Sequence, residues 1–293
     1  MAISNTGKTP QLETVQLPTD SSGNTRTQVK LRDGVSADEI EFGDLGYSKA
    51  AVESYAEFSC QKEKGVIPAE CRFQVALPTP LAPIQLYVVP EHRQSIEPIY
   101  EARLLQELKE ITVNIPGEEL AIQWDTAVEF GVLEGVFPTY LSNSENDILE
   151  RLIRLGEAVP SGVELGYHLC YGDAGHKHFV EPQDTNMLVT VANGIALKIN
   201  RPLNWVHLPV PKNRFDREYY APLKSLNLHN DTELYLGLVH DTDGIEGTRK
   251  RIEVASSVID SFGVATECGF GRRLPNRINE LMQIHTQVAA TIR

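Results

Sequence analysis

Three side chains have the types that zinc prefers as ligands and a spacing that lets them share one ion. His168 and Cys170 lie two positions apart, and Cys268 follows much later in the chain. A strand alternates its faces, so His168 and Cys170 point the same way if their segment is extended, whereas a helix would place them roughly 200° apart. Three protein ligands leave a fourth position for water or substrate, as in catalytic zinc sites. The alternative is a core histidine beside a cysteine that packs as a small apolar residue.

The segments between Cys170 and Cys268 repeat a strand followed by a helix. The strand-like runs 203–210 and 233–240 lie there, and each is followed by a polar or glycine-rich loop and a helix-like stretch. In a closed parallel barrel the carboxyl ends of all strands meet at one face, so residues far apart in sequence can hold one metal. The spacing therefore permits a shared site, although it is not that of a zinc finger.

After residue 45, strand-like and helix-like segments alternate along the chain, and this order predicts an α/β fold of the TIM-like (β/α)8 barrel type. An eight-stranded barrel needs two strands beyond the six clear ones, and only the weak segments 12–17 and 28–31 can supply them. We therefore expect a barrel that is incomplete or irregular at its N-terminal side, or one open on one side and covered by a second subunit of a homo-oligomer. The six clear strands end near residues 78, 125, 172, 210, 241 and 268, and the helices are expected at 47–64, 90–113, 145–155, 181–198, 245–262 and 274–292.

Composition divides the chain into a short arm and one domain. Residues 1–25 are rich in Ser, Thr, Asn, Gly and Pro and lack periodicity, which predicts a flexible N-terminal arm. The chain has 293 residues, of which 41% are hydrophobic and 23% charged. It can bury one large core, so we expect a single barrel domain over residues 26–293.

The net charge and the cysteines limit the classes of partner. A formal charge of -13 disfavours nucleic acid and anionic membranes, because binding to phosphates depends on Lys and Arg. The sequence has no apolar run of about 18 residues and no signal-like start, so we expect no membrane partner and a cytoplasmic location. The four cysteines are widely spaced, which fits reduced thiols rather than a disulfide framework.

The motifs resemble those of one family of zinc enzymes. A His168-x-Cys170 strand, Cys268 before a glycine at the end of the last strand, and a strand that ends in Gln123-Trp124-Asp125 resemble the C-terminal catalytic barrel of cobalamin-independent methionine synthase. They are also similar to the epoxyalkane:coenzyme M transferases of the same superfamily. The resemblance covers residues 70–290 and implies that His168, Cys170 and Cys268 bind Zn²⁺, which holds a substrate thiol as thiolate for attack on carbon.

The resemblance also implies roles around the metal. Asp125 matches the aspartate that holds the substrate amino group in methionine synthase, although it could instead cap the following turn. Gln123 and Trp124 are expected to bind substrate together with Asp125. His240 ends another strand-like run and is also expected to bind substrate, although the residues 241–244 that follow it form an ordinary turn sequence. Asp173 lies on the loop after the ligand strand, where barrel enzymes place catalytic residues, and is expected to act with Asp125. His178 on the same loop could be a solvated residue.

The sequence departs from the family at the fourth ligand. Methionine synthase has a Glu ligand on the strand after the His-x-Cys strand, whereas this chain has His207 there and no carboxylate. His207 could be a substitute ligand, a catalytic acid or base, or a core histidine. Strict alternation sends Glu267 away from the metal toward the helices, where Arg272 or Arg273 could pair with it, so Glu267 is not counted as a ligand.

These observations predict a zinc-dependent transferase that activates a thiol for methyl or alkyl transfer. A free thiol has a pKa of about 8.5, and coordination to zinc removes its proton. Zinc has no redox chemistry of its own, so transfer fits better than oxidation. The expected partners are a small-molecule thiol and an alkyl donor. The alternatives are a carbon-sulfur lyase or epoxide-opening thiol transferase on the same zinc, and a non-catalytic barrel with a structural zinc.

Overall fold

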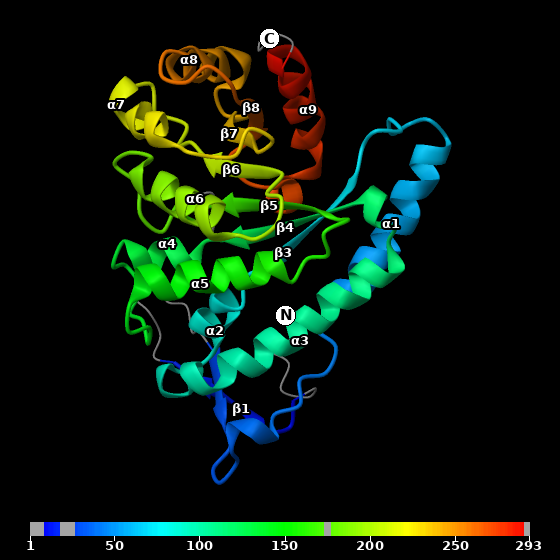
Figure 1. The fold of residues 1–293 in the computed structure, drawn as a ribbon, viewed down its shortest axis with the longest axis vertical. Coiled ribbons are helices and arrows are strands. Elements are labelled where there is room, and N and C mark those ends of the chain that lie inside the picture. The colour runs from blue at the N-terminus through cyan, green and yellow to red at the C-terminus, as the bar shows by residue number, and fades with distance from the viewer. Residues whose placement is uncertain (1–8, 18–26, 173–176, 290–293) are drawn as a thin grey trace. The chain divides into compact units, whose positions relative to one another are not determined.

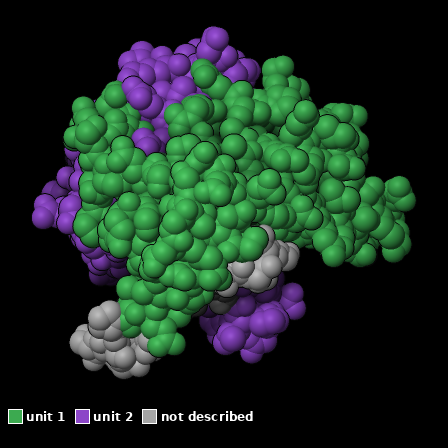
Figure 2. All heavy atoms as spheres, turned by 90° about the horizontal axis from the view of Figure 1, so that it is seen from below, with its two compact units in different colours: residues 1–124, 138–147, 154–164 green, residues 125–137, 148–153, 165–293 purple. Residues whose placement is uncertain are grey.

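The chain divides into two compact units. The computed structural model describes residues 9–17, 27–172 and 177–289. Unit 1 comprises residues 1–124, 138–147 and 154–164, and unit 2 comprises residues 125–137, 148–153 and 165–293, as coloured in Figure 2. The expectation of a single domain over residues 26–293 stays a prediction.

A six-stranded sheet is the central element of the fold and confirms the α/β class (Figure 1). The strands follow one another in sequence order across the sheet, and the last four pair in parallel. All six lie where the sequence predicts strands. They are β3 (Phe73–Pro78), β4 (Leu120–Thr126), β5 (Glu164–Leu169), β6 (Trp205–Pro209), β7 (Glu233–Val239) and β8 (Gly263–Thr266).

The sheet is not closed into an eight-stranded barrel within the described residues. The two weak N-terminal segments do form strands, β1 (Leu12–Gln16) and β2 (Thr27–Leu31). They pair antiparallel with each other in a separate two-stranded sheet, so they do not extend the six-stranded one. Strand β1 also lies inside the expected flexible arm, of which residues 12–16 are therefore regular structure.

In unit 1, contacts with a distant carboxylate explain where one long helix begins. Helix α1 (Tyr47–Glu63) follows Gly46, which has φ 93° and no side-chain cap. Instead, Glu107 from α3 (Arg93–Asn114) accepts hydrogen bonds from the backbone N–H groups of Leu45 and Ser48, both at 2.8 Å. A carboxylate distant in sequence thus caps α1, and Arg103 Nη2 lies 2.6 Å from it. The helices before β4 are η3 (Ala37–Glu39), α1 (Tyr47–Glu63), α2 (Leu81–Tyr87), η4 (Pro90–His92), α3 (Arg93–Asn114) and η5 (Gly117–Glu119).

Unit 2 alternates strand and helix from β5 to the end of the described chain. One hydrophobic cluster of this unit joins β7 to α9 (Pro275–Ala289) through Val239, Leu281, Ile284 and Val288. The helix expected at 181–198 begins only at residue 186. The backbone N–H of Asn186 donates a hydrogen bond to Asp184 Oδ1 at 2.8 Å. None of the described helices is long and apolar enough to cross a membrane. The helices after β4 are α4 (Val128–Leu133), α5 (Ser144–Glu157), α6 (Asn186–Lys198), α7 (Arg217–Tyr220), η6 (Ala221–Ser225), α8 (Gly244–Ser256), η7 (Phe270–Arg272) and α9 (Pro275–Ala289).

Candidate metal centre

Strand β5 presents two of the candidate ligands at its carboxyl end. His168 lies in the strand, and Cys170 follows its last residue. The hydroxyl of Thr126, at the end of β4, donates to the His168 carbonyl at 3.0 Å and accepts from the Cys170 N–H at 3.3 Å. One buried hydroxyl group therefore fixes the backbone of both residues.

Cys268 completes the cluster from the far end of the sheet. It lies two residues beyond β8, and its Sγ is 3.4 Å from Cys170 Sγ and 3.5 Å from His168 Nε2. The exposed fractions of His168, Cys170 and Cys268 are 6%, 3% and 6%. Their ligand atoms all lie within 4.8 Å of one another, the one such group of His, Cys, Asp or Glu found in the described parts of the chain. The geometry brings together the three residues that the sequence predicts as ligands.

The donor atoms fit a zinc ion. Zinc bonds of about 2.3 Å to sulfur and about 2.0–2.1 Å to nitrogen place neighbouring tetrahedral ligands about 3.5–3.8 Å apart. The sulfur-sulfur and sulfur-nitrogen distances of 3.4 and 3.5 Å are close to that range. Thiolate and imidazole are also the ligands that select zinc over harder cations.

The charges of the cluster favour a cation. The hydrogen bond with Cys268 lowers the pKa of Cys170 despite burial, and the His168 imidazole lowers it further. Burial opposes charge on His168, but the neighbouring Cys170 thiolate raises the pKa of His168 to about 9. The lowered pKa of Cys170 favours its thiolate, which is the form of cysteine that binds a metal ion.

His207 lies beside the cluster without joining it. Strands β5 and β6 pair His168 with His207 in register, and their rings stack with centroids 4.4 Å apart. His207 Nε2 lies 3.0 Å from the carbonyl oxygen of Thr266, so that nitrogen donates its proton there. Burial, with a smaller effect of His168, lowers the pKa of His207 and keeps the ring neutral. These contacts place His207 as a packed neighbour of the candidate ligand His168.

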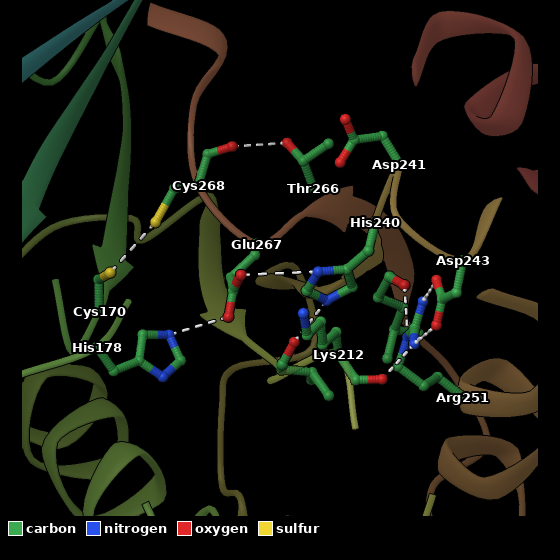
Figure 3. A network of polar contacts seen from close by, with 12 residues as sticks. Cys170, His178, Lys212, His240, Asp241, Asp243, Arg251, Thr266, Glu267 and Cys268 are labelled. Atoms are coloured by element: carbon green, nitrogen blue, oxygen red, sulfur yellow. Dashed lines mark hydrogen bonds and ion pairs between the residues drawn. The ribbon is translucent and has the colours of Figure 1, made fainter. Parts of the chain in front are cut away.

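Glu267 lies between two histidines of unit 2, as Figure 3 shows. Its Oε1 is 2.9 Å from His178 Nε2, and its Oε2 is 3.6 Å from His240 Nδ1. His240 is held in turn by its Nε2, which donates to the Val210 carbonyl at 2.8 Å. The sequence predicts that Glu267 turns toward the helices, but β8 ends at residue 266, so strand alternation does not extend to Glu267.

The Glu267 contacts form an ion pair within the protein. Burial opposes the charge of both partners, yet contact with Glu267 raises the pKa of His178, and contact with His178 lowers the pKa of Glu267. Both shifts favour the ionised form of the pair. His178 is not the solvated residue that its loop position suggests, because only 4% of its side chain is exposed. The sequence carries no signal for this pairing, since the two residues lie on different loops.

Arg251 of α8 supports the loops that follow β6 and β7 (Figure 3). Its side chain is fully buried, and Nε donates to the Leu238 carbonyl at 2.8 Å. The guanidinium also donates to the Lys212 carbonyl and pairs with both carboxylate oxygens of Asp243, at 2.6 and 2.8 Å. Asp243 therefore has a structural partner.

The remaining predicted site residues that the structure describes lie outside the cluster of candidate ligands. Trp124 is fully buried, and its indole N–H donates to the Leu155 carbonyl at 3.1 Å, which leaves no exposed surface on Trp124 for a ligand. Gln123 is buried in the same strand. Asp125 is partly exposed and contributes to the raised pKa of His168. Asp173 lies outside the described residues.

Comparisons with known proteins bear on the fold. The sequence matches no protein-family model and no curated protein. A similar solved structure is that of a provisionally assigned vitamin-B12 independent methionine synthase from Listeria monocytogenes, with a TM-score of 0.52 and 16% sequence identity. The match covers 87% of this chain and 71% of that one. It shows that this chain shares an α/β fold with that structure.

Proposed function

We propose that this protein is a zinc-dependent transferase that activates a thiol substrate as thiolate for methyl or alkyl transfer. The observation that carries the proposal is the buried cluster of His168, Cys170 and Cys268, whose ligand atoms lie within 4.8 Å of one another. No fourth His, Cys, Asp or Glu joins this group among the residues that the structure describes. Three protein ligands leave a coordination position for a substrate. The likeness to a methionine synthase structure supports the proposal at the level of fold.

Each residue of the cluster has a defined task in this proposal. His168, Cys170 and Cys268 would hold the metal. Zinc bound there would supply a Lewis acid that lowers the pKa of a thiol below neutral pH. Asp125, which is partly exposed and acts electrostatically on His168, would bind a positively charged group of the substrate. The burial of the ligands would exclude water and strengthen these interactions.

The substrates are proposed to be a small thiol and an alkyl donor. The formal charge of -13 disfavours a polyanionic macromolecule as partner. A cytoplasmic location and a homo-oligomer remain part of the proposal.

Metal content tests the site directly. The wild-type protein is expected to carry about one zinc per chain, measured by elemental analysis after purification without chelators. Cys170→Ser and Cys268→Ser should each remove most of it, because a hydroxyl is a poor ligand for zinc. Cys60→Ser is the matched control, since Cys60 lies on α1 in unit 1. Full zinc content in both ligand variants would refute the site.

A structural zinc is the second candidate, because all three ligands are buried. The two roles differ in what a thiol does to the loaded protein. A thiol that becomes a thiolate on the metal releases a proton, so its binding enthalpy depends on the ionisation enthalpy of the buffer. Calorimetry in two buffers measures this release. If no thiol of a broad panel binds with proton release, a structural zinc or a carbon-sulfur lyase replaces the thiol transferase.

A further inference from the structure

Cys268 is the candidate ligand that strand pairing holds least. His168 and Cys170 sit on or next to β5, which is hydrogen-bonded to β6 in regular register. Cys268 lies past the end of β8, whose pairing with β7 is irregular between Leu236 and Val239. A ligand at such a position needs other contacts to hold its side chain where a metal would bind.

The residue before Cys268 supplies such contacts. The side chain of Glu267 is 16% exposed and reaches His178 on one side and His240 on the other. His178 follows β5 and His240 follows β7 in the chain. The Val210 carbonyl, after β6, holds His240 in its orientation at 2.8 Å. Glu267 therefore connects the segment that carries Cys268 directly to the segments after β5 and β7, and through His240 to the segment after β6.

Thr266 is anchored as well. Its carbonyl accepts from His207 Nε2 at 3.0 Å, and its hydroxyl donates to the carbonyl of Cys268 at 2.7 Å. Both residues before Cys268 are thus held by histidines, which come from β6 and from the loops after β5 and β7. None of these histidines belongs to the ligand cluster.

We infer that Glu267 is a positioning residue, which fixes Cys268 for metal binding through its contacts with His178 and His240. The inference rests on the proposed metal site. Its physical basis is preorganisation: a ligand already held in place loses less conformational freedom when the metal binds, and the metal is bound more tightly. Glu267 takes no part in coordination, because its carboxylate faces the two histidines.

The chain offers a matched control on the same histidine. Glu181 Oε2 lies 3.5 Å from His178 Nδ1, but the side chain of Glu181 is 65% exposed and contacts no part of the Cys268 segment in the described structure. Glu181→Gln removes one negative charge near His178, as Glu267→Gln does, without touching the positioning contacts. A comparison of the two variants therefore separates positioning from a general loss of charge.

Zinc affinity, measured by competition with a chromophoric chelator, tests the inference without an assay of activity. Glu267→Ala is expected to weaken zinc binding by about 10–100-fold, the usual cost of losing a contact that orients a ligand. Glu267→Gln should lose less, since an amide oxygen can still accept from His178, and Glu181→Gln should bind as the wild type does. His178→Gln is a second variant that leaves Glu267 and its contact with His240 in place, and it should fall between the wild type and Glu267→Ala.

The outcomes separate the inference from the function on which it rests. Circular dichroism of the metal-free variants checks that each is folded, and His178→Gln carries the test if Glu267→Ala is not. Wild-type affinity in a folded Glu267→Ala or His178→Gln protein would overturn the positioning role while the metal site stands. Equal losses in Glu181→Gln and Glu267→Gln would overturn it too. A wild-type protein that binds no zinc would overturn the proposed function and the positioning role together.

Discussion

The sulfur atoms of Cys170 and Cys268 lie 3.4 Å apart, although 98 residues separate them in the chain. Strands β6 and β7 lie between β5 and β8 in the sheet. In a flat sheet, three strand spacings of about 4.8 Å would keep the ends of β5 and β8 roughly 14 Å apart. The contact therefore shows that this part of the sheet is strongly curved at its carboxyl end, as in a barrel wall, even though the described strands do not close.

This contact predicts how the metal-free protein reacts with a disulfide oxidant. Oxidised glutathione should take two electrons from the two cysteines, form the Cys170–Cys268 disulfide and leave as two molecules of reduced glutathione. Zinc bound to the two cysteines should protect them from this oxidation. Peptide mass spectrometry without reductant detects the cross-link, and Cys170→Ser is the control that cannot form it. Free thiols at both positions after oxidation of the metal-free protein would contradict the prediction.

The contacts of the buried Arg251 side chain predict that its substitution destabilises the protein strongly. Arg251→Met removes the partner of Asp243 and the donors to two backbone carbonyls, so we expect it to lower the free energy of unfolding by about 3–5 kcal/mol. Lys250→Met is the control, because Lys250 is 61% exposed and pairs with Glu246 on the helix surface. Urea denaturation measures both, and the control should stay within about 0.5 kcal/mol of the wild type.

The close approach of Trp205 to Gly166 in β5 leaves no room for a side chain at position 166. A Cβ atom on Gly166 would lie 1.9 Å from Cε2 of Trp205, the residue opposite it on β6. Gly166→Ala must displace the indole ring, so we expect a loss of about 1–3 kcal/mol of stability. Gly162→Ala serves as the comparison, since a Cβ there meets no atom within 4 Å in the described structure. Equal unfolding midpoints of the two variants would argue against this packing.

Glu107 predicts how stability responds to acid. Burial opposes its charge, but the backbone N–H groups of Ser48 and Leu45 and the guanidinium of Arg103 lower the pKa of Glu107. The carboxylate therefore stabilises the folded protein above its unfolded pKa of about 4.3, and this contribution is lost as the pH falls through the lower folded value. Glu107→Gln should be less stable than the wild type at pH 7, by about 3 kcal/mol, and the gap should narrow in acid. Unfolding curves at several pH values measure this difference in free energy of unfolding. A difference that does not change with pH would contradict the prediction, and Glu53→Gln is the control because Glu53 is exposed.

The strands and the three candidate ligands could be predicted from the sequence because both follow local rules. Continuous apolar runs mark strands buried on both faces, and β4 and β5 are buried along nearly their whole length. The spacing of His168 and Cys170 depends only on strand alternation. The partner of β1 could not be predicted, because whether a short strand pairs locally or joins a larger sheet depends on tertiary contacts.

The surroundings of the site were harder to predict for a physical reason. Glu267 leaves the alternation of β8 because the strand ends one residue earlier, and strand ends are the least certain part of a sequence-based assignment. Its partners His178 and His240 come from loops after other strands, and no periodic pattern relates them. The role of Thr126 could not be predicted from the sequence either. It depends on how closely β4 approaches β5, because the Thr126 hydroxyl bonds to the backbone of His168 and Cys170.

The order of the strands has a consequence for the folding of unit 2. Cys268 reaches Cys170 only after β6, β7 and β8 have each been added through a crossover, because parallel neighbours cannot be joined by a tight turn. Contacts of such high sequence separation form slowly, since loop closure costs entropy before the contact is made. We therefore expect the contact between the two sulfur atoms to form late in the folding of the unit.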